Sequence, residues 1–195
     1  MEESIIEYFR TFPFIGSDDI KLIYSLGKIK RIKAGELIIK AGEKNYSGIF
    51  VLKGLLRNYV ITSDGEERTL LFCAEGNQTG AHATIFYNKP ATENIEAIEN
   101  SVIFMLNSEV AEKFTVKHPK LLKLQNNILK KVLAESVERI IFFTILSPEE
   151  RFKQLCTKQP NLVKRVPQKY LASYIGVTTV SLSRIKSRIK DKKES

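Results

Sequence analysis

The sequence predicts an α+β fold: an N-terminal antiparallel β-roll of the jelly-roll type, a long dimerisation helix and a C-terminal all-α helix-turn-helix domain. Residues 28–106 consist of short apolar runs, rich in β-branched and aromatic residues, that turn residues separate. Residues 119–146 contain no helix breaker after their first proline. Residues 167–189 have the spacing of two short helices joined by a tight turn. The predicted domains are therefore 1–118, 119–146 and 147–195.

Charge is unevenly distributed along the chain of 195 residues, whose formal net charge is +9. Residues 1–146 contain 19 Lys/Arg and 18 Asp/Glu, whereas residues 147–195 contain 12 and 4. The basic excess thus belongs to the C-terminal domain. There it indicates either an acidic partner such as nucleic acid or a solvated basic tail.

The cysteines and the N-terminal segment indicate the compartment. Cys73 and Cys156 are far apart and form no CxxC motif, so nothing indicates a disulfide framework or a cysteine-rich metal site. The N-terminal segment is acidic and lacks the apolar core of a signal peptide. No run approaches the roughly 18 apolar residues of a membrane-spanning helix. These features predict a soluble, cytoplasmic protein.

The first elements in chain order are two short helices within residues 4–26. Their apolar residues recur at helical spacing, with an interruption at Phe12-Pro13-Phe14 and a cap predicted at Ser17-Asp18-Asp19. Strands are then expected at 48–54, 55–61, 68–73, 94–98 and 101–106.

Glycines mark the corners of the predicted roll. Gly35 and Gly42 belong to two Ala-Gly-Glu repeats seven residues apart, and Gly54 separates two strands. Asp64-Gly65 predicts a hairpin turn that needs a positive φ. After the last strand, Ser108 is expected to cap a helix that runs to about residue 117.

The segment 119–146 predicts a helix of about 28 residues, roughly 42 Å long. Its apolar residues fall on more than one face, which indicates two partners. We expect these to be its own sheet and the same helix of a second subunit, with complete burial inside a monomer as the alternative. The apolar residues are Leu121, Leu122, Leu124, Ile128, Leu129, Val132, Leu133, Val137, Ile140 and Ile141.

The C-terminal domain begins with Ser147-Pro148-Glu149-Glu150, which has the spacing of a capping box. In a 20-residue window that starts at Gln168, apolar and small residues then occupy the core positions of a helix-turn-helix. Gly176 supplies the positive φ of the turn, Pro167 opens the first helix and Thr178 caps the second. Two packed helices of another α domain are the alternative. The core positions are Leu171, Ala172, Ile175, Val177, Leu182 and Ile185.

The second helix, expected from Thr179 to about Ile189, would lie in the major groove of DNA. Arg184 is the best candidate base reader, because a guanidinium can pair bidentately with guanine. The other predicted base readers are Thr179, Val180 and Ser183. The residues expected to bind phosphates, which give affinity without reading sequence, are Gln168, Lys169, Thr178, Ser181 and Arg188. Lys190, Lys192 and Lys193 are interpreted as a solvated tail.

Taken together, the roll, the long helix and the C-terminal motif resemble the Crp/Fnr family of bacterial transcription factors over nearly the whole chain. The most specific stretches are KAGELIIKAGEKNYSGIFVLKGLLRNYV and VPQKYLASYIGVTTVSLSRIKSRI. The resemblance implies a homodimer that binds double-stranded DNA at an inverted-repeat operator, with a small-molecule or redox signal received in the roll. RNA polymerase is a further candidate partner.

Two departures from the family pattern matter. A β-hairpin wing commonly follows the recognition helix, but this sequence ends at Ser195, so wing contacts are not expected. Cyclic-nucleotide-binding members carry a Gly-Glu pair and, further along, an arginine followed by Ser or Thr. At those places this chain has Ala81 and Ala91. The candidate effector pocket is Gly80, Ala81, His82, Ala83, Thr84, Ala91 and Thr92, and cyclic AMP is not expected to be the effector.

Catalysis and metal binding have little support in the sequence. A metal-dependent enzyme of the cupin kind needs several converging histidines and a carboxylate, and only His82 and His118 occur. Haem binding or oxidant sensing by His82 with Cys73 competes with the simpler view of Cys73 as a core residue. An iron–sulfur sensor of the Fnr kind would need an N-terminal cysteine set. We expect no catalytic residues, metal or cofactor. The alternatives to a gated regulator are a constitutive DNA-binding protein with a scaffold roll and a β-roll enzyme.

Overall fold

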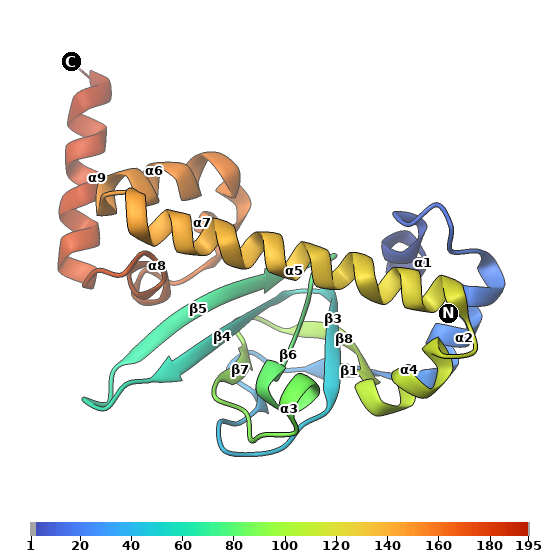
Figure 1. The fold of residues 1–195 in the computed structure, drawn as a ribbon. Helices are drawn as coiled ribbons and strands as arrows, with labels where there is room; N and C mark the ends of the chain where they lie inside the picture. Colours follow the sequence, from blue (N-terminus) through green and yellow to red (C-terminus); the bar gives the residue numbers. More distant parts are fainter. Residues whose placement is uncertain (1–2, 195) are drawn as a thin grey trace. The chain divides into compact units, whose positions relative to one another are not determined.

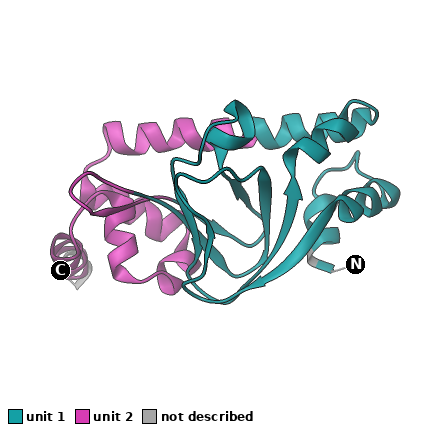
Figure 2. Cartoon of the chain, turned by 90° about the horizontal axis from the view of Figure 1, so that it is seen from below, with its two compact units in different colours: residues 1–60, 71–130 teal, residues 61–70, 131–195 magenta. Residues whose placement is uncertain are grey.

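The computed structural model describes residues 3–194. They form two compact units (Figure 2). The first unit comprises the chain up to Val60 together with Leu71–Lys130, and the second comprises Ile61–Leu70 and the chain from Lys131 onward. The α+β class is confirmed: strands form an antiparallel roll, a long helix follows, and the C-terminal region is helical.

Helices and strands occur in the order shown in Figure 1. The strands are β1 (Gly27–Ile32), β2 (Leu37–Ile39), β3 (Ser47–Lys53), β4 (Leu55–Ile61), β5 (Glu67–Ala74), β6 (Gln78–Gly80), β7 (Asn94–Ala97) and β8 (Ser101–Asn107). The helices are α1 (Glu3–Arg10), α2 (Ser17–Leu26), α3 (His82–Tyr87), α4 (Ser108–Thr115), α5 (Pro119–Ile145), α6 (Pro148–Lys158), α7 (Pro160–Arg165), α8 (Gln168–Ile175) and α9 (Thr179–Glu194).

The roll consists of two four-stranded sheets, in the orders β1-β8-β3-β6 and β2-β7-β4-β5. Alternate strand residues point inward and make an aliphatic core that includes Ile49, Ile95 and Ile103, each fully buried. Arg57 on β4 is also buried and pairs with Glu96, the residue opposite it on β7, at 2.7 Å. The pair neutralises a charge that would be costly to bury alone.

Glycines shape the corners of the roll as predicted. Gly35 and Gly42 have φ of +80° and +90°, and Gly65 has +82° in the hairpin between β4 and β5. Gly54, between β3 and β4, has φ +99°, and a Cβ there would lie 2.7 Å from the Cα of Ser101. This strand junction therefore requires glycine for both conformation and space.

The two N-terminal helices cover an apolar cluster next to β3 and β8. Ile5 and Phe9 of α1 and Ile20 and Ile23 of α2 are buried together with Phe104 of β8. The beginning of α5 completes this cluster through its buried leucines Leu121 and Leu124. The cluster also contains Leu52 of β3, so the expected packing of the long helix against its own sheet is confirmed for its first turns.

Several local predictions need correction. The cap of α4 is Asn107, whose side chain accepts from the N–H groups of Glu109 and Val110, and not Ser108. That helix ends at Thr115. The N-cap of α2 is Gly16, whose N–H donates to Asp19. The first error arises because Asn107 and Ser108 are neighbouring polar residues that compete for one capping position. At α2 the predicted Asp19 is the third helical residue, and its carboxylate accepts from the N–H of the capping glycine. The helices α3 and α7 were not predicted, since six-residue helices have too few turns to show a period.

The second apolar face of α5 is exposed in the single chain. Its side chains recur at spacings of three, four or seven residues and so form one stripe along the helix. Leu133 is 66% exposed and Ile140 is 65% exposed. The stripe consists of Leu122, Leu129, Leu133, Val137 and Ile140. Complete burial of this helix within a monomer is therefore wrong. None of the helices within residues 3–194 is long and apolar enough to cross a membrane.

Candidate nucleic-acid interface

The helix-turn-helix lies at α8 and α9 in the second unit. Leu171, Ala172 and Ile175 of α8 are buried with Leu182 and Ile185 of α9. These are core positions that the spacing predicted, and Val177 in the turn is half-buried. Burying this seam holds the second helix at a fixed angle to the first and leaves the opposite face of α9 exposed.

The turn between the two helices depends on Gly176. Its φ of +76° and ψ of +37° are left-handed, and its N–H bonds back to the carbonyls of Ala172 and Ser173. Val177 adds a second bond to the carbonyl of Ala172 at 3.0 Å. This arrangement satisfies the last carbonyls of α8 while the chain reverses. The predicted role of Gly176 is confirmed.

The N-terminal end of α9 presents the predicted base readers to solvent. Thr179, Val180, Ser183 and Arg184 are all exposed. Thr178 caps the helix, because its hydroxyl accepts from the N–H of Ser181 at 3.2 Å. A capped helix end with exposed polar side chains and a guanidinium is suited to enter a major groove.

Two arginines that the sequence did not single out hold the end of α8. Arg151 of α6 donates to the carbonyl of Ile175 at 2.8 Å and to that of Leu146 at 2.9 Å. Arg139 of α5 donates to the carbonyl of Tyr174 at 2.6 Å. The capping box at Ser147 starts α6 as predicted and so places Arg151. The turn is thereby tied to α5 and α6.

Arg139 lies in an aromatic environment. Its guanidinium is 3.7 Å from the ring centre of Tyr174, 4.4 Å from that of Phe143 and 5.0 Å from that of Phe142. Burial lowers the pKa of Arg139 and raises the pKa of Tyr174. The cation–π contacts offset part of the cost of removing this charge from water.

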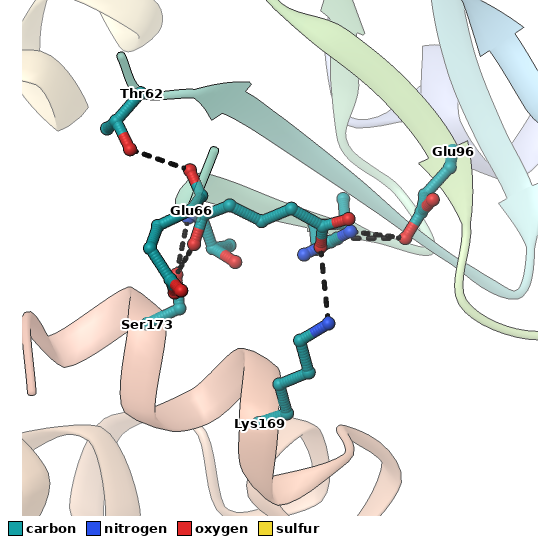
Figure 3. A network of polar contacts seen from close by, with 8 residues as sticks. Thr62, Glu66, Glu96, Lys169 and Ser173 are labelled. Carbon is teal, nitrogen blue, oxygen red and sulfur yellow. Dashed lines mark hydrogen bonds and ion pairs between the residues drawn. The ribbon is translucent and has the colours of Figure 1, made fainter. Parts of the chain in front are cut away.

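The predicted phosphate-binding residues are accessible, and two of them have acidic partners. Gln168, Lys169, Thr178 and Arg188 are exposed, and Ser181 is half-buried. Lys169 (Figure 3) lies 3.9 Å from a carboxylate oxygen of Glu67, and Arg188 lies 3.7 Å from Glu149. Lys190 is exposed on α9, whereas the side chains of Lys192 and Lys193, and all of Ser195, lie outside the described residues.

The two threonine hydroxyls of the candidate effector segment form hydrogen bonds within that segment. Gly80, Ala81, Thr84 and Ala91 are buried, while His82 and Ala83 are partly exposed and Thr92 is exposed. The hydroxyl of Thr84 donates to the carbonyl of Lys89 at 2.7 Å, and that of Thr92 donates to Glu93. Neither hydroxyl can therefore donate a hydrogen bond to a ligand without rearrangement.

Glu93 is a buried acid in this segment that the sequence reading missed. It is 5% exposed, and its carboxylate lies 3.7 Å from Nδ1 of His82. Burial opposes its ionisation, but hydrogen bonds from His82 and Thr92 outweigh that cost and lower the pKa of Glu93. The segment therefore places a negative charge where the family pattern has ligand-binding residues.

Cys73 is fully buried in the aliphatic core of the roll, and His118 precedes α5 and stacks on Phe114. Within residues 3–194, no three His, Cys, Asp or Glu side chains cluster in a way that could hold a metal ion.

The sequence is similar to a known domain family and to known regulators. The family model of the cyclic nucleotide-binding domain matches residues 29–118. The chain is 24% identical over 173 residues to the fumarate and nitrate reduction regulatory protein of Vibrio cholerae, a match that covers 82% of this chain and 67% of that protein. It is 22% identical to the anaerobic regulatory protein of Pasteurella multocida, covering 82% and 62%. The chain thus spans about two thirds of these relatives.

Solved structures share the fold. FixK2 from Bradyrhizobium japonicum superposes with a TM-score of 0.72 at 16% identity, over 85% of each chain. A regulator assigned to the Crp/Fnr family from Eubacterium rectale superposes with a TM-score of 0.75 at 16% identity, over 95% of this chain and 88% of that one. The likeness includes the helical C-terminal region as well as the roll.

Proposed function

We propose that this chain is a member of the Crp/Fnr family and acts in the cytoplasm as a dimeric, sequence-specific DNA-binding regulator of transcription with no catalytic role. The observation that carries the proposal is the exposed N-terminal face of α9, which is held by a buried seam, a glycine turn and two arginine contacts. The charge of residues 147–195, with 12 basic and 4 acidic side chains, favours a polyanionic partner.

The stripe on α5 supports a second copy of the chain as the protein partner. A two-fold axis along this helix would bring identical leucine and isoleucine side chains together. Two recognition helices related by that axis would read an inverted repeat whose half-sites are about 34 Å apart. RNA polymerase is a further candidate partner.

Substitution of α8 and α9 residues tests the proposed roles in DNA binding. Arg184→Ala is expected to cost about 1–3 kcal/mol on the operator and to relax preference at one base pair. Lys169→Ala is expected to weaken binding to all sequences alike. It should also reduce the slope of log affinity against log salt concentration by about one. Binding isotherms on operator and random duplexes at several salt concentrations measure both effects. Equal losses on the two duplexes for both variants would refute this division of roles.

Cyclic AMP is not the proposed effector, and the roll gives a physical reason. A buried cyclic phosphate needs a cation or several directed donors. Ala91 stands where the family pattern has arginine, and the buried acid Glu93 would repel the phosphate. Arg57, a buried arginine of the roll, is already paired with Glu96. Isothermal titration should show no saturable heat below about millimolar cyclic AMP; micromolar affinity coupled to tighter operator binding would contradict this.

A constitutive DNA-binding protein with a scaffold roll is the second candidate. It is favoured by the internal hydrogen bonds of Thr84 and Thr92, because these hydroxyl groups already donate to atoms of the candidate effector segment. Operator affinity that does not change on addition of cell extract would support it over a ligand-gated regulator.

A further inference from the structure

The tip of the β4–β5 hairpin, residues 61–70, belongs to the same compact unit as the helix-turn-helix. The tip is well formed: the N–H and the hydroxyl of Thr62 donate to the carbonyl of Glu66 at 2.9 and 3.0 Å, and Gly65 donates to Thr62 at 2.9 Å. Figure 3 shows Thr62 and Glu66 of this tip next to the helix that carries Ser173 and Lys169. The turn itself, residues 63–66, is exposed, as hairpin tips ordinarily are, whereas Glu67 and Thr69 on its β5 side contact α8.

One hydroxyl on α8 binds the backbone of β5. Ser173 (Figure 3) donates to the carbonyl of Glu67 at 2.9 Å and accepts from the N–H of Thr69 at 2.8 Å. β5 is an edge strand of its sheet, so these backbone groups face away from the neighbouring strand and need a partner. A single serine thus satisfies both groups and fastens the strand to the first helix of the motif.

The same strand residue also approaches a predicted phosphate-binding side chain. The carboxylate of Glu67 lies 3.9 Å from Nζ of Lys169, one turn before Ser173 on α8. Glu67 has an intermediate exposure, while Lys169 remains exposed at 70% of its side chain. A DNA phosphate and the Glu67 carboxylate would therefore compete for the same ammonium group.

We propose that residues 61–70 form an autoinhibitory strap on α8, held by Ser173 and Lys169, which is released when DNA binds. This rests on the proposed DNA-binding function. The strap is continuous with the part of β5 in the other unit, Leu71–Ala74, so a rearrangement of that strand can change the strap through the covalent chain. Loosening an autoinhibitory strap should raise the affinity for DNA. If the strap were only a structural brace, loosening it would lower that affinity.

Neutralising Glu67 tests the strap. Glu67→Gln is expected to raise affinity for a random-sequence duplex about two- to five-fold at low salt, the range for one surface ion pair. Glu66→Gln removes the same charge from the neighbouring exposed residue and is the matched control, with a smaller change. In the background of Lys169→Gln the gain from Glu67→Gln should disappear. Equal effects of the two glutamine variants, or a loss of affinity in Glu67→Gln, would overturn the proposal.

Hydrogen exchange of the Thr69 amide gives a readout that does not depend on affinity. Ser173→Ala should accelerate its exchange about ten-fold, as expected for one lost hydrogen bond. DNA binding by the wild-type protein should accelerate it as well. A Thr69 amide that stays equally protected in the DNA complex would reject the strap while leaving DNA binding intact. Failure of the wild-type protein to bind DNA would reject the proposed function, and the strap with it.

Discussion

Leu133→Glu is expected to separate the protein into monomers and to reduce affinity for an inverted-repeat operator to that for a single half-site. Leu133 is 66% exposed at the middle of the α5 stripe. Burying a leucine contributes about 1.5–3 kcal/mol, and each residue occurs twice in an interface with a two-fold axis. The lost burial alone would therefore weaken the dimer by about 3–6 kcal/mol, which is roughly 10²–10⁴-fold.

Sedimentation equilibrium and operator binding measure the two consequences of this change. Ala134→Glu adds the same charge at the next exposed position of α5 and serves as the control, because Ala134 lies outside the stripe. Ile140→Glu, within the stripe, should reproduce the effect of Leu133→Glu. A dimer of unchanged affinity in both stripe variants would show that α5 is not the dimer interface.

Gly176→Ala is expected to destabilise the helix-turn-helix by about 2–4 kcal/mol and to abolish operator binding before the roll unfolds. Part of the cost is conformational, because a left-handed residue with a Cβ costs roughly 1–2 kcal/mol. The rest is crowding: a Cβ would lie 3.0 Å from a ring carbon of Phe143 and 3.2 Å from Nη1 of Arg151. Arg151 would have to move from the carbonyl of Ile175 that it caps.

Gly35→Ala is the matched control for Gly176→Ala. Gly35 also has a positive φ, but no atom beyond its two chain neighbours lies within 4 Å of the added Cβ, so only the conformational cost of about 1–2 kcal/mol applies. Denaturant unfolding gives the stabilities, and operator binding gives the functional readout. Equal destabilisation by the two substitutions, or intact operator binding in Gly176→Ala, would contradict the role assigned to the turn.

The elements that could be predicted from sequence are those whose evidence is local. The seam of α8 and α9 depends on apolar residues within one window, and the turn depends on Gly176. The capping box at Ser147 needs only four consecutive residues. The roll was predictable as a class because its strands are short and bounded by glycine corners. The order of its strands was not, since pairing such as β1 with β8 joins residues far apart in the chain.

The contacts that the sequence could not predict are tertiary. Arg139 reaches a carbonyl 35 residues away, and Ser173 binds a strand residue 106 positions earlier. A serine on an amphipathic helix or an acid in a hairpin has no pattern that identifies such a partner. Glu93 was missed for the same reason, because the pattern showed which ligand residues were absent but not that an acid there would be buried.

Selection of bound sequences from a random DNA pool, with and without cell extract, tests most directly whether this chain is a dimeric sequence-specific regulator. The predicted result is enrichment of an inverted repeat with half-site centres about 34 Å apart, and Arg184→Ala should lose preference at one symmetric pair of positions. Recovery of a single unpaired half-site, or of no enriched sequence in either condition, would contradict it.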